Sequence, residues 1–269
     1  MTSENRIDQR FAALKEAGQP AFVAYVSAGD PDMDRSLEIL FALERAGADV
    51  IELGVPFSDP MADGIVNQMA AHRALEAGAT THKVLDLIRK FRERSETPVV
   101  LFTYLNPIYS YGFAKFHDDA AAAGADGVLL LDLPPDEASL NSELTESGSL
   151  RHIRLIAPTT PADRIPKLAA AAEGFIYYVS REGVTGTQTA LAEGIAENVA
   201  AIKAHTDVPV AVGFGISTPA QAAEVGKAAD GVVVGSAIVR IIEQNGSSPD
   251  VAAKVEAFVK PLVDAAKSV

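Results

Sequence analysis

Two acidic residues between positions 51 and 64 have a spacing that suits acid–base catalysis. Glu52 lies near the end of a short apolar run, and Asp63 follows in the next loop. Side chains alternate along a strand, so Val50, Glu52 and Gly54 share one face. Both faces of a parallel sheet are normally buried, so we expect a buried Glu52 carboxyl with a raised pKa. Two carboxylates in different surroundings allow the acid and base roles to be divided near neutral pH.

Structural roles remain open for several of the other polar residues. Asp63 precedes an apolar run and would also serve as the N-cap of the next helix. Core packing or turn formation would equally explain Tyr104, Tyr177, Asn106 and Asp132. A charged residue on an inward strand face has fewer structural explanations, which leaves Glu52 as the strongest candidate for catalysis.

Eight short apolar runs predict the strands that must position these groups. They are Ala21–Ser27, Asp49–Leu53, Pro98–Thr103, Gly127–Leu131, Ile153–Ala157, Phe175–Ser180, Val208–Val212 and Gly231–Val234. Helical periodicity separates them, as in Arg35–Ala46 and Val84–Arg94. The tripeptide Gly-Ala-Asp ends at Asp49 and again at Asp126, next to the second and fourth predicted strands. The similar Ala-Ala-Asp ends at Asp230, before the eighth. Such αβ loops return the chain from each helix to the next strand.

Eight such units predict an α/β fold, the closed (β/α)8 or TIM barrel, as a single domain over residues 1–269. An extra N-terminal helix, about Asn5–Ala17, would plug the barrel floor, and a tail helix, Asp250–Lys267, would close the chain. An open doubly wound sheet is the alternative. It is disfavoured because residues 27–31, after the first strand, lack the G-x-G-x-x-G pattern of a nucleotide loop.

Active sites of such barrels lie at the carboxyl ends of the strands. The polar residues predicted there are Glu52, Tyr104, Asn106, Asp132, Tyr177, Ser180 and Arg181. Histidines and lysines fall instead in helices or at their flanks, apart from His152 at the start of the fifth strand. This placement disfavours a histidine-bound metal and a lysine Schiff base, so proton transfer by carboxylates is the chemistry we expect.

Glycine-rich loops after the last three strands predict an anion site with a lid. Gly213 and Gly215 follow the seventh strand, Gly235 and Ser236 follow the eighth, and each loop leads into a helix. Backbone N–H groups at helix N-termini bind phosphate, although the glycines would also serve simply as turns. The segment 181–187 after the sixth strand has the composition of a mobile lid.

Composition limits the partners of the chain. The 269 residues include no cysteine and carry a formal net charge of −13, which disfavours nucleic acid and anionic membranes as partners and excludes disulfides. An anionic substrate must therefore be held by local groups. A polar N-terminus without an apolar signal region, and the absence of a long apolar run, predict a cytoplasmic protein.

Four motifs resemble the tryptophan synthase alpha chain family. They are ELGVPFSDPMADG at 52–64, SREGVTGT at 180–187, GFGIS at 213–217 and VVVGSAIV at 232–239. The resemblance runs from Phe22 to Val239. It implies a (β/α)8 barrel and a lyase of tryptophan biosynthesis, which splits indole-3-glycerol phosphate into indole and D-glyceraldehyde 3-phosphate by a retro-aldol reaction.

The resemblance also implies roles for individual residues. Glu52 would protonate the indole ring carbon and then accept the hydroxyl proton, while Asp63 would bind the indole N–H. The implied substrate pocket comprises Tyr25, Tyr104, Tyr177 and the lid residue Thr185, and the implied phosphate site comprises Gly186, Gly215, Gly235 and Ser236. The chain departs from the family pattern at Ile65, usually proline, and at Tyr25, usually phenylalanine.

A partner is implied as well. The family pairs with a tryptophan synthase beta chain in an α2β2 heterotetramer. The chain itself would need no cofactor, since the pyridoxal phosphate belongs to the beta chain. We expect the contact surface to include Pro56, Asp59, Pro60 and Asn106, together with their neighbours Ser58 and Pro107.

Two other classes of function stay open. One is another phosphate-binding barrel enzyme, such as a sugar-phosphate isomerase or indole-glycerol-phosphate synthase, although the synthase would place a catalytic lysine at a strand end. The other is a non-catalytic subunit that activates its partner, which the intact pair Glu52 and Asp63 disfavours.

Overall fold

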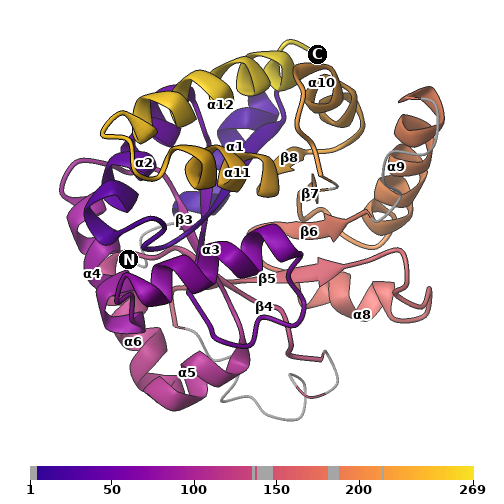
Figure 1. The fold of residues 1–269 in the computed structure, drawn as a ribbon. Helices are drawn as coiled ribbons and strands as arrows, with labels where there is room; N and C mark the ends of the chain where they lie inside the picture. The colour runs from indigo at the N-terminus through magenta and orange to yellow at the C-terminus, as the bar shows by residue number, and fades with distance from the viewer. Residues whose placement is uncertain (1–4, 135–136, 138–147, 181–187, 214) are drawn as a thin grey trace.

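A closed parallel barrel forms the centre of the molecule. The computed structural model describes residues 5–134, 137, 148–180, 188–213 and 215–269. Within them, eight strands pair in chain order and β8 returns to β1 (Figure 1). The strands are β1 Ala21–Ser27, β2 Val50–Gly54, β3 Val99–Thr103, β4 Gly127–Leu130, β5 Arg151–Ile156, β6 Ile176–Val179, β7 Val210–Gly213 and β8 Gly231–Val234. The barrel prediction is confirmed, and the open sheet is excluded.

Helices surround the barrel. They are α1 Arg6–Glu16, α2 Met33–Ala46, α3 Ile65–Glu76, α4 Thr81–Arg92, α5 Leu105–Tyr111, α6 Phe113–Ala123, α8 Ile165–Ala170, α9 Gln188–Lys203, α10 Pro219–Ala228, α11 Ser236–Asn245 and α12 Val251–Lys267. As predicted, α1 precedes β1, and its Phe11 packs on Phe175 with ring centroids 5.5 Å apart. The tail helix α12 packs against α2, α10 and α11 (Figure 1). None of the described helices combines the length and hydrophobicity needed to cross a bilayer.

Alternation along the strands decides which side chains reach the barrel interior. Val50 belongs to the inner cluster with Val23 and Val100, whereas Ile51 and Leu53 join the cluster between strands and helices. Glu52 shares the inward face with Val50, as predicted, because side chains two residues apart point the same way.

The predicted strand boundaries differ from the observed ones at several ends. β5 begins at Arg151, so His152 lies inside the strand rather than at its start. β7 begins at Val210, because the preceding Pro209 has no N–H for the ladder. Asn106 and Pro107, expected in a loop, belong to the short helix α5.

Four acidic side chains secure the amino end of the barrel. Each accepts a hydrogen bond from a backbone N–H near the start of the preceding strand. These four carboxylate clamps join Asp49 to Phe22, Asp126 to Val99, Glu173 to His152 and Asp230 to Val210, with N···O distances of 2.7, 2.8, 3.0 and 2.9 Å. Arg92 binds the Asp126 carboxylate and Lys203 that of Asp230, which compensates for their negative charge. The recurring Ala-Asp before the strands is therefore a structural motif.

Candidate active site

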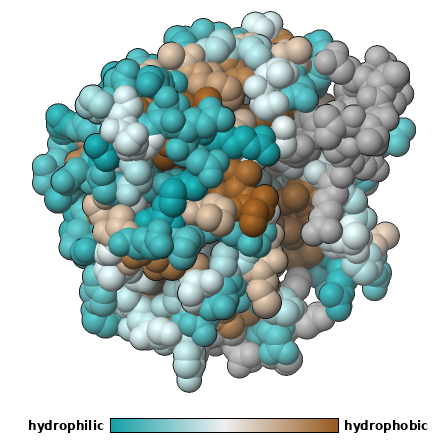
Figure 2. Space-filling model, in the orientation of Figure 1, coloured by the Kyte–Doolittle hydropathy of each residue, from teal (hydrophilic) through white to brown (hydrophobic). Residues whose placement is uncertain are grey.

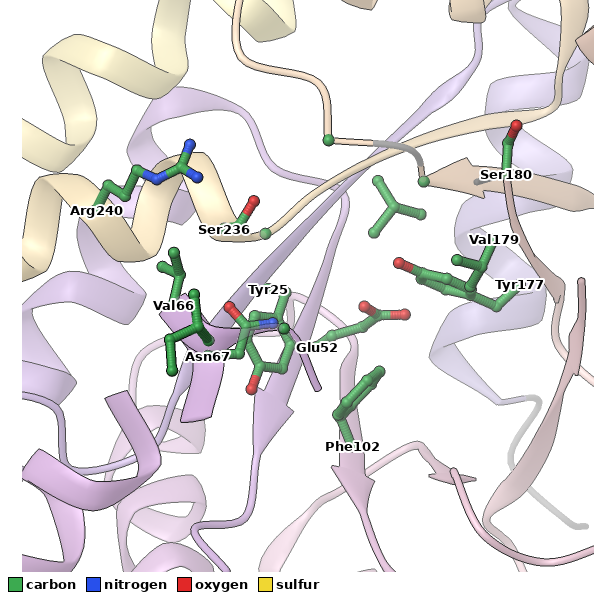
Figure 3. A pocket seen from close by; sticks show the side chains of 16 residues that line it. Tyr25, Glu52, Val66, Asn67, Phe102, Tyr177, Val179, Ser180, Ser236 and Arg240 are labelled. Carbon is green, nitrogen blue, oxygen red and sulfur yellow. The ribbon is translucent and has the colours of Figure 1, made fainter. Parts of the chain in front are cut away.

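A cavity of about 410 Å³ opens at the carboxyl ends of the strands, where the sequence predicted the site. Its lining comes from six strands or their following loops, from the first turn of α3 and from the first two turns of α11 (Figure 3). The residues are Tyr25, Glu52, Gly64, Ile65, Val66, Asn67, Phe102, Tyr177, Val179, Ser180, Gly213, Gly215, Val233, Gly235, Ser236 and Arg240. In Figure 2, hydrophobic side chains gather around a hollow beside α3.

Glu52 is the buried acid of this cavity. Its side chain is fully buried, and neither carboxyl oxygen has a hydrogen-bond partner within the described residues. Figure 3 shows the carboxyl directed into the space between Phe102 and Tyr177. Burial raises its pKa to about 8, because the low-dielectric interior disfavours the charged form. Near neutral pH the group holds a proton that is not committed to any neighbour, and it can both donate and recover that proton.

Two tyrosines stand beside Glu52, and each needs a glycine opposite its hydroxyl. Tyr25 pairs in register with Glu52. A Cβ added at Gly54 would lie 2.6 Å from the Tyr25 Oη, and one at Gly213 would lie 2.5 Å from the Tyr177 Oη. Burial and the nearby carboxylates raise the pKa of both phenols, which keeps them neutral. Their rings therefore form uncharged walls of the cavity.

Phe102 completes the aromatic part of the wall. Its ring meets the ring of Tyr25 edge-on, with centroids 4.9 Å apart. Three aromatic residues around one buried carboxyl make a site that suits a flat, apolar ring.

Asp63 is held by residues from other segments. Its carboxylate accepts a hydrogen bond from Tyr104 Oη at 2.7 Å, and the same hydroxyl accepts one from Ala62 N–H at 3.0 Å. Asn67 also hydrogen-bonds the Asp63 side chain, yet its buried Oδ1 has no partner within the described residues. Burial raises the pKa of Asp63, while the bonds from Tyr104 and Asn67 oppose that rise.

The alternative role of Asp63 as a helix cap is excluded. The N-cap of α3 is Gly64, without a side-chain cap bond. The helix begins at Ile65, the position where the family usually has proline, so the substitution leaves a helix start at this point. Ile65 is 69% exposed and lines the cavity.

The loops after β7 and β8 bound the opposite end of the cavity. Gly215 has φ +84°, a conformation that favours glycine, and is exposed. Gly235 lies against Tyr25, because a Cβ there would be 3.3 Å from the ring, and Ser236 begins α11. α11 has no side-chain cap, whereas Thr218 and Gln221 form a capping box at the start of α10. Of the two helix N-termini expected to offer N–H groups, only that of α11 is uncapped.

The remaining predicted residues fall into two groups. Thr185, Gly186 and Arg181 lie outside the described residues. Asp132 and Asn106 do not line the cavity; Asp132 accepts a hydrogen bond from Leu105 N–H at 2.7 Å and so supports the start of α5.

Several lining residues were not predicted from the sequence. Phe102 was detectable, because it follows the inward Val100 by two positions. Arg240 was also detectable, because it follows Ser236 by four residues and shares its helix face. Asn67 gave no local signal, since its role depends on the fold of the preceding loop.

Comparison with known proteins shows the family to which this chain belongs. The family model for the tryptophan synthase alpha chain matches residues 11–267. The chain belongs to the tryptophan synthase alpha chain family. It is 49% identical to the tryptophan synthase alpha chain of Opitutus terrae (strain DSM 11246 / JCM 15787 / PB90-1), covering 98% of this chain and 99% of the relative. It is 48% identical to that of Geobacter sulfurreducens (strain ATCC 51573 / DSM 12127 / PCA), covering 97% and 98%.

Solved structures of the tryptophan synthase family share the fold. Tryptophan synthase subunit alpha from Legionella pneumophila str. Paris superimposes with a TM-score of 0.90 at 39% identity, over 99% of this chain and all of that one. A tryptophan synthase structure from M. tuberculosis gives a TM-score of 0.86 at 32% identity, over 98% and 99%. Family membership makes this chain a lyase of tryptophan biosynthesis that catalyses the alpha reaction.

Proposed function

We propose that the cavity cleaves indole-3-glycerol phosphate and that Glu52 moves the proton. The observation that carries this proposal is the fully buried carboxyl, whose pKa is about 8 and whose two oxygens have no hydrogen-bond partner among the described residues. Such a group is protonated before the reaction and, once ionised, is a base strong enough to take a proton back. The aromatic walls supply a slot for the indole ring.

The reaction divides into two proton transfers. Protonated Glu52 donates its proton to the indole ring carbon that bears the glycerol chain. Positive charge then spreads to the ring nitrogen, whose N–H donates to the Asp63 carboxylate. Ionised Glu52 next accepts the proton of the adjacent side-chain hydroxyl, and the electron pair of the breaking C–C bond restores the indole. The products are indole and the aldehyde of glyceraldehyde 3-phosphate.

The rest of the substrate fits the remaining walls. We place the indole ring against Tyr25 and Tyr177, with Tyr104 holding Asp63 in position. The phosphate lies at Gly215, Gly235 and Ser236, next to the uncapped start of α11. Gly186 and the lid residue Thr185 would complete the site from outside the described residues.

The family partner is a beta chain, and we propose an α2β2 assembly. The contact surface would include Pro56, Asp59, Pro60 and Asn106. Ser58, Asp59 and Asn106 are exposed, and so are two nearby apolar side chains, Met61 at 88% and Tyr109 at 74%. Large exposed apolar side chains beside a catalytic loop favour a protein partner there.

The proposed partner would also hold the cofactor. No lysine lines the cavity in the described part of the chain, so no Schiff base to pyridoxal phosphate is expected in this subunit. We assign pyridoxal phosphate to the beta chain and no cofactor to this one. A cytoplasmic location would fit an enzyme of amino-acid synthesis with this composition.

The deciding experiment is indole release by the purified chain. Indole-3-glycerol phosphate is supplied without the beta chain, and indole is measured over time for the wild type and Glu52→Gln. We expect slow but measurable release by the wild type and a loss of roughly 10²–10⁴-fold in the variant. Equal rates in the two proteins would refute the mechanism. If indole is released only when a beta chain is added, the chain is a subunit whose activity requires its partner.

A further inference from the structure

Arg240 places a positive charge at one end of the cavity. It follows Ser236 by four residues on α11, so the two side chains share a helix face, and both line the cavity. Figure 3 shows the Arg240 side chain on the same side as Ser236, away from Glu52. It is the only Arg or Lys among the described lining residues.

The Arg240 guanidinium is exposed and has no acidic partner within the described residues. The acid best placed to pair with it is Glu243, three residues further along α11. Glu243 is bound instead by Arg73 of α3, at 3.1 Å. Arg73 is held a second time by the buried Asp30, at 2.8 Å. Glu243 is thus engaged by Arg73, and Arg240 stays available.

The charge of the whole chain makes this availability significant. Asp and Glu outnumber Lys and Arg by 36 to 23, so the general field repels an anionic substrate. Backbone N–H groups and a serine hydroxyl supply only partial charges at the start of α11. A guanidinium supplies a full charge and a planar set of donors that suits phosphate oxygens.

We propose that Arg240 contacts the substrate phosphate and determines the preference of this site for a phosphorylated substrate. The proposal rests on the proposed function, because it takes the phosphate to lie at Gly235 and Ser236. It adds a charged residue to a phosphate site that otherwise consists of glycines and a serine. Binding of the phosphate precedes and persists through the reaction, so Arg240 contributes equally to the ground state and the transition state.

The test is steady-state cleavage by Arg240→Gln, Arg240→Lys and the control Arg45→Gln. Arg45 lies on α2 outside the cavity lining and pairs with Glu256, so its loss changes the net charge equally. We expect Arg240→Gln to raise KM roughly tenfold with kcat nearly unchanged, Arg240→Lys to recover part of the loss, and Arg45→Gln to match the wild type. The KM of the wild type should also rise with salt more steeply than that of Arg240→Gln.

A second measurement separates this proposal from the proposed function. Inorganic phosphate serves as a competitive inhibitor, and its inhibition constant is compared for the wild type, Arg240→Gln and Ser236→Asp. Weaker inhibition in both variants supports the role of Arg240. Weaker inhibition in Ser236→Asp alone overturns that role and leaves the proposed phosphate site standing. Unchanged inhibition in both folded variants overturns the phosphate site itself, and the role of Arg240 with it.

Discussion

The hydroxyl of Tyr104 donates a hydrogen bond to the Asp63 carboxylate across 2.7 Å, which joins the end of β3 to the loop before α3. The same oxygen accepts the Ala62 N–H, so one phenol fixes both the backbone and the side chain of the catalytic loop. Asp63 therefore owes its position to a residue 41 positions away. A loop positioned in part by a hydroxyl from another segment is also a loop that another protein can shift.

We expect Tyr104→Phe to lower kcat for indole release about tenfold while leaving the fold intact. The variant removes the donor to Asp63 and the acceptor of Ala62 N–H, so the carboxylate loses its fixed position. Steady-state kinetics measure the effect, and Tyr109→Phe is the matched control because Tyr109 is 74% exposed on α5. An unchanged kcat in Tyr104→Phe would show that Asp63 does not need this support.

The buried Glu52 carboxyl should make stability depend on pH. Its pKa is about 8 in the folded protein and 4.5 in the unfolded chain, so the folded state binds more protons between these values. The contribution of this group to stability is therefore fully present below about pH 4.5 and is lost as the pH rises through about 8. The slope from this one group reaches at most about 1.4 kcal/mol per pH unit.

Glu52→Gln should remove that slope. Denaturant unfolding from pH 5 to 9 should show the variant gaining stability relative to the wild type as the pH rises, even though it is inactive. Glu38→Gln, on the exposed face of α2, is the control and should keep the wild-type profile. Parallel profiles for the wild type and Glu52→Gln would contradict the raised pKa.

Gly54→Ala, at the end of β2, should distort the cavity wall and destabilise the protein. The added Cβ would meet the Tyr25 hydroxyl at 2.6 Å, so Tyr25 must move or the strand must shift, at a cost of about 1–3 kcal/mol. Gly64→Ala is the matched control, because a Cβ there meets nothing within 4 Å. Urea unfolding should show a loss for the first variant only.

A double variant tests whether the clash with Tyr25 causes the loss of stability in Gly54→Ala. Gly54→Ala combined with Tyr25→Phe removes the closest clash and should recover part of the lost stability. The recovery stays incomplete, because two ring carbons of Tyr25 lie 3.1 Å from the added Cβ. A double variant as unstable as Gly54→Ala would place the damage elsewhere.

Asp59→Ala should weaken stimulation by the beta chain while leaving indole release by the isolated chain nearly unchanged. Asp59 is exposed, and within the described residues its side chain accepts a hydrogen bond from the hydroxyl of the adjacent Ser58. Titration with beta chain, followed by indole release, measures the half-maximal concentration, which should rise for the variant. Asp86→Ala on α4 removes an equal charge and should behave as the wild type. Equal stimulation of Asp59→Ala would remove this residue from the interface.

The sequence sufficed for features that depend on periodicity. Alternation along β2 placed Glu52 on the inward face, and eight repeating units predicted the closed barrel. The link between Tyr104 and Asp63 could not be predicted, because it depends on how two loops fold over the barrel mouth. The capping box of α10 went unrecognised although Thr218 and Gln221 have the required spacing, because the neighbouring glycines suggested an anion site. The pairing of Arg73 with Glu243 depends on helix packing, so the sequence did not show that Glu243 is engaged away from Arg240.

The carboxylate clamps divide the barrel into equal modules. Each clamp joins two strands of the same βαβ unit: β1 with β2, β3 with β4, β5 with β6, and β7 with β8. Within the described part of the chain, no clamp spans the connection from one unit to the next. A circularly permuted chain opened after β2, β4 or β6 would therefore keep every clamp within one continuous segment. A chain opened inside a unit would place an acid and its amide at opposite termini. The barrel is thus assembled from four βαβ units, each of which contains its own carboxylate clamp.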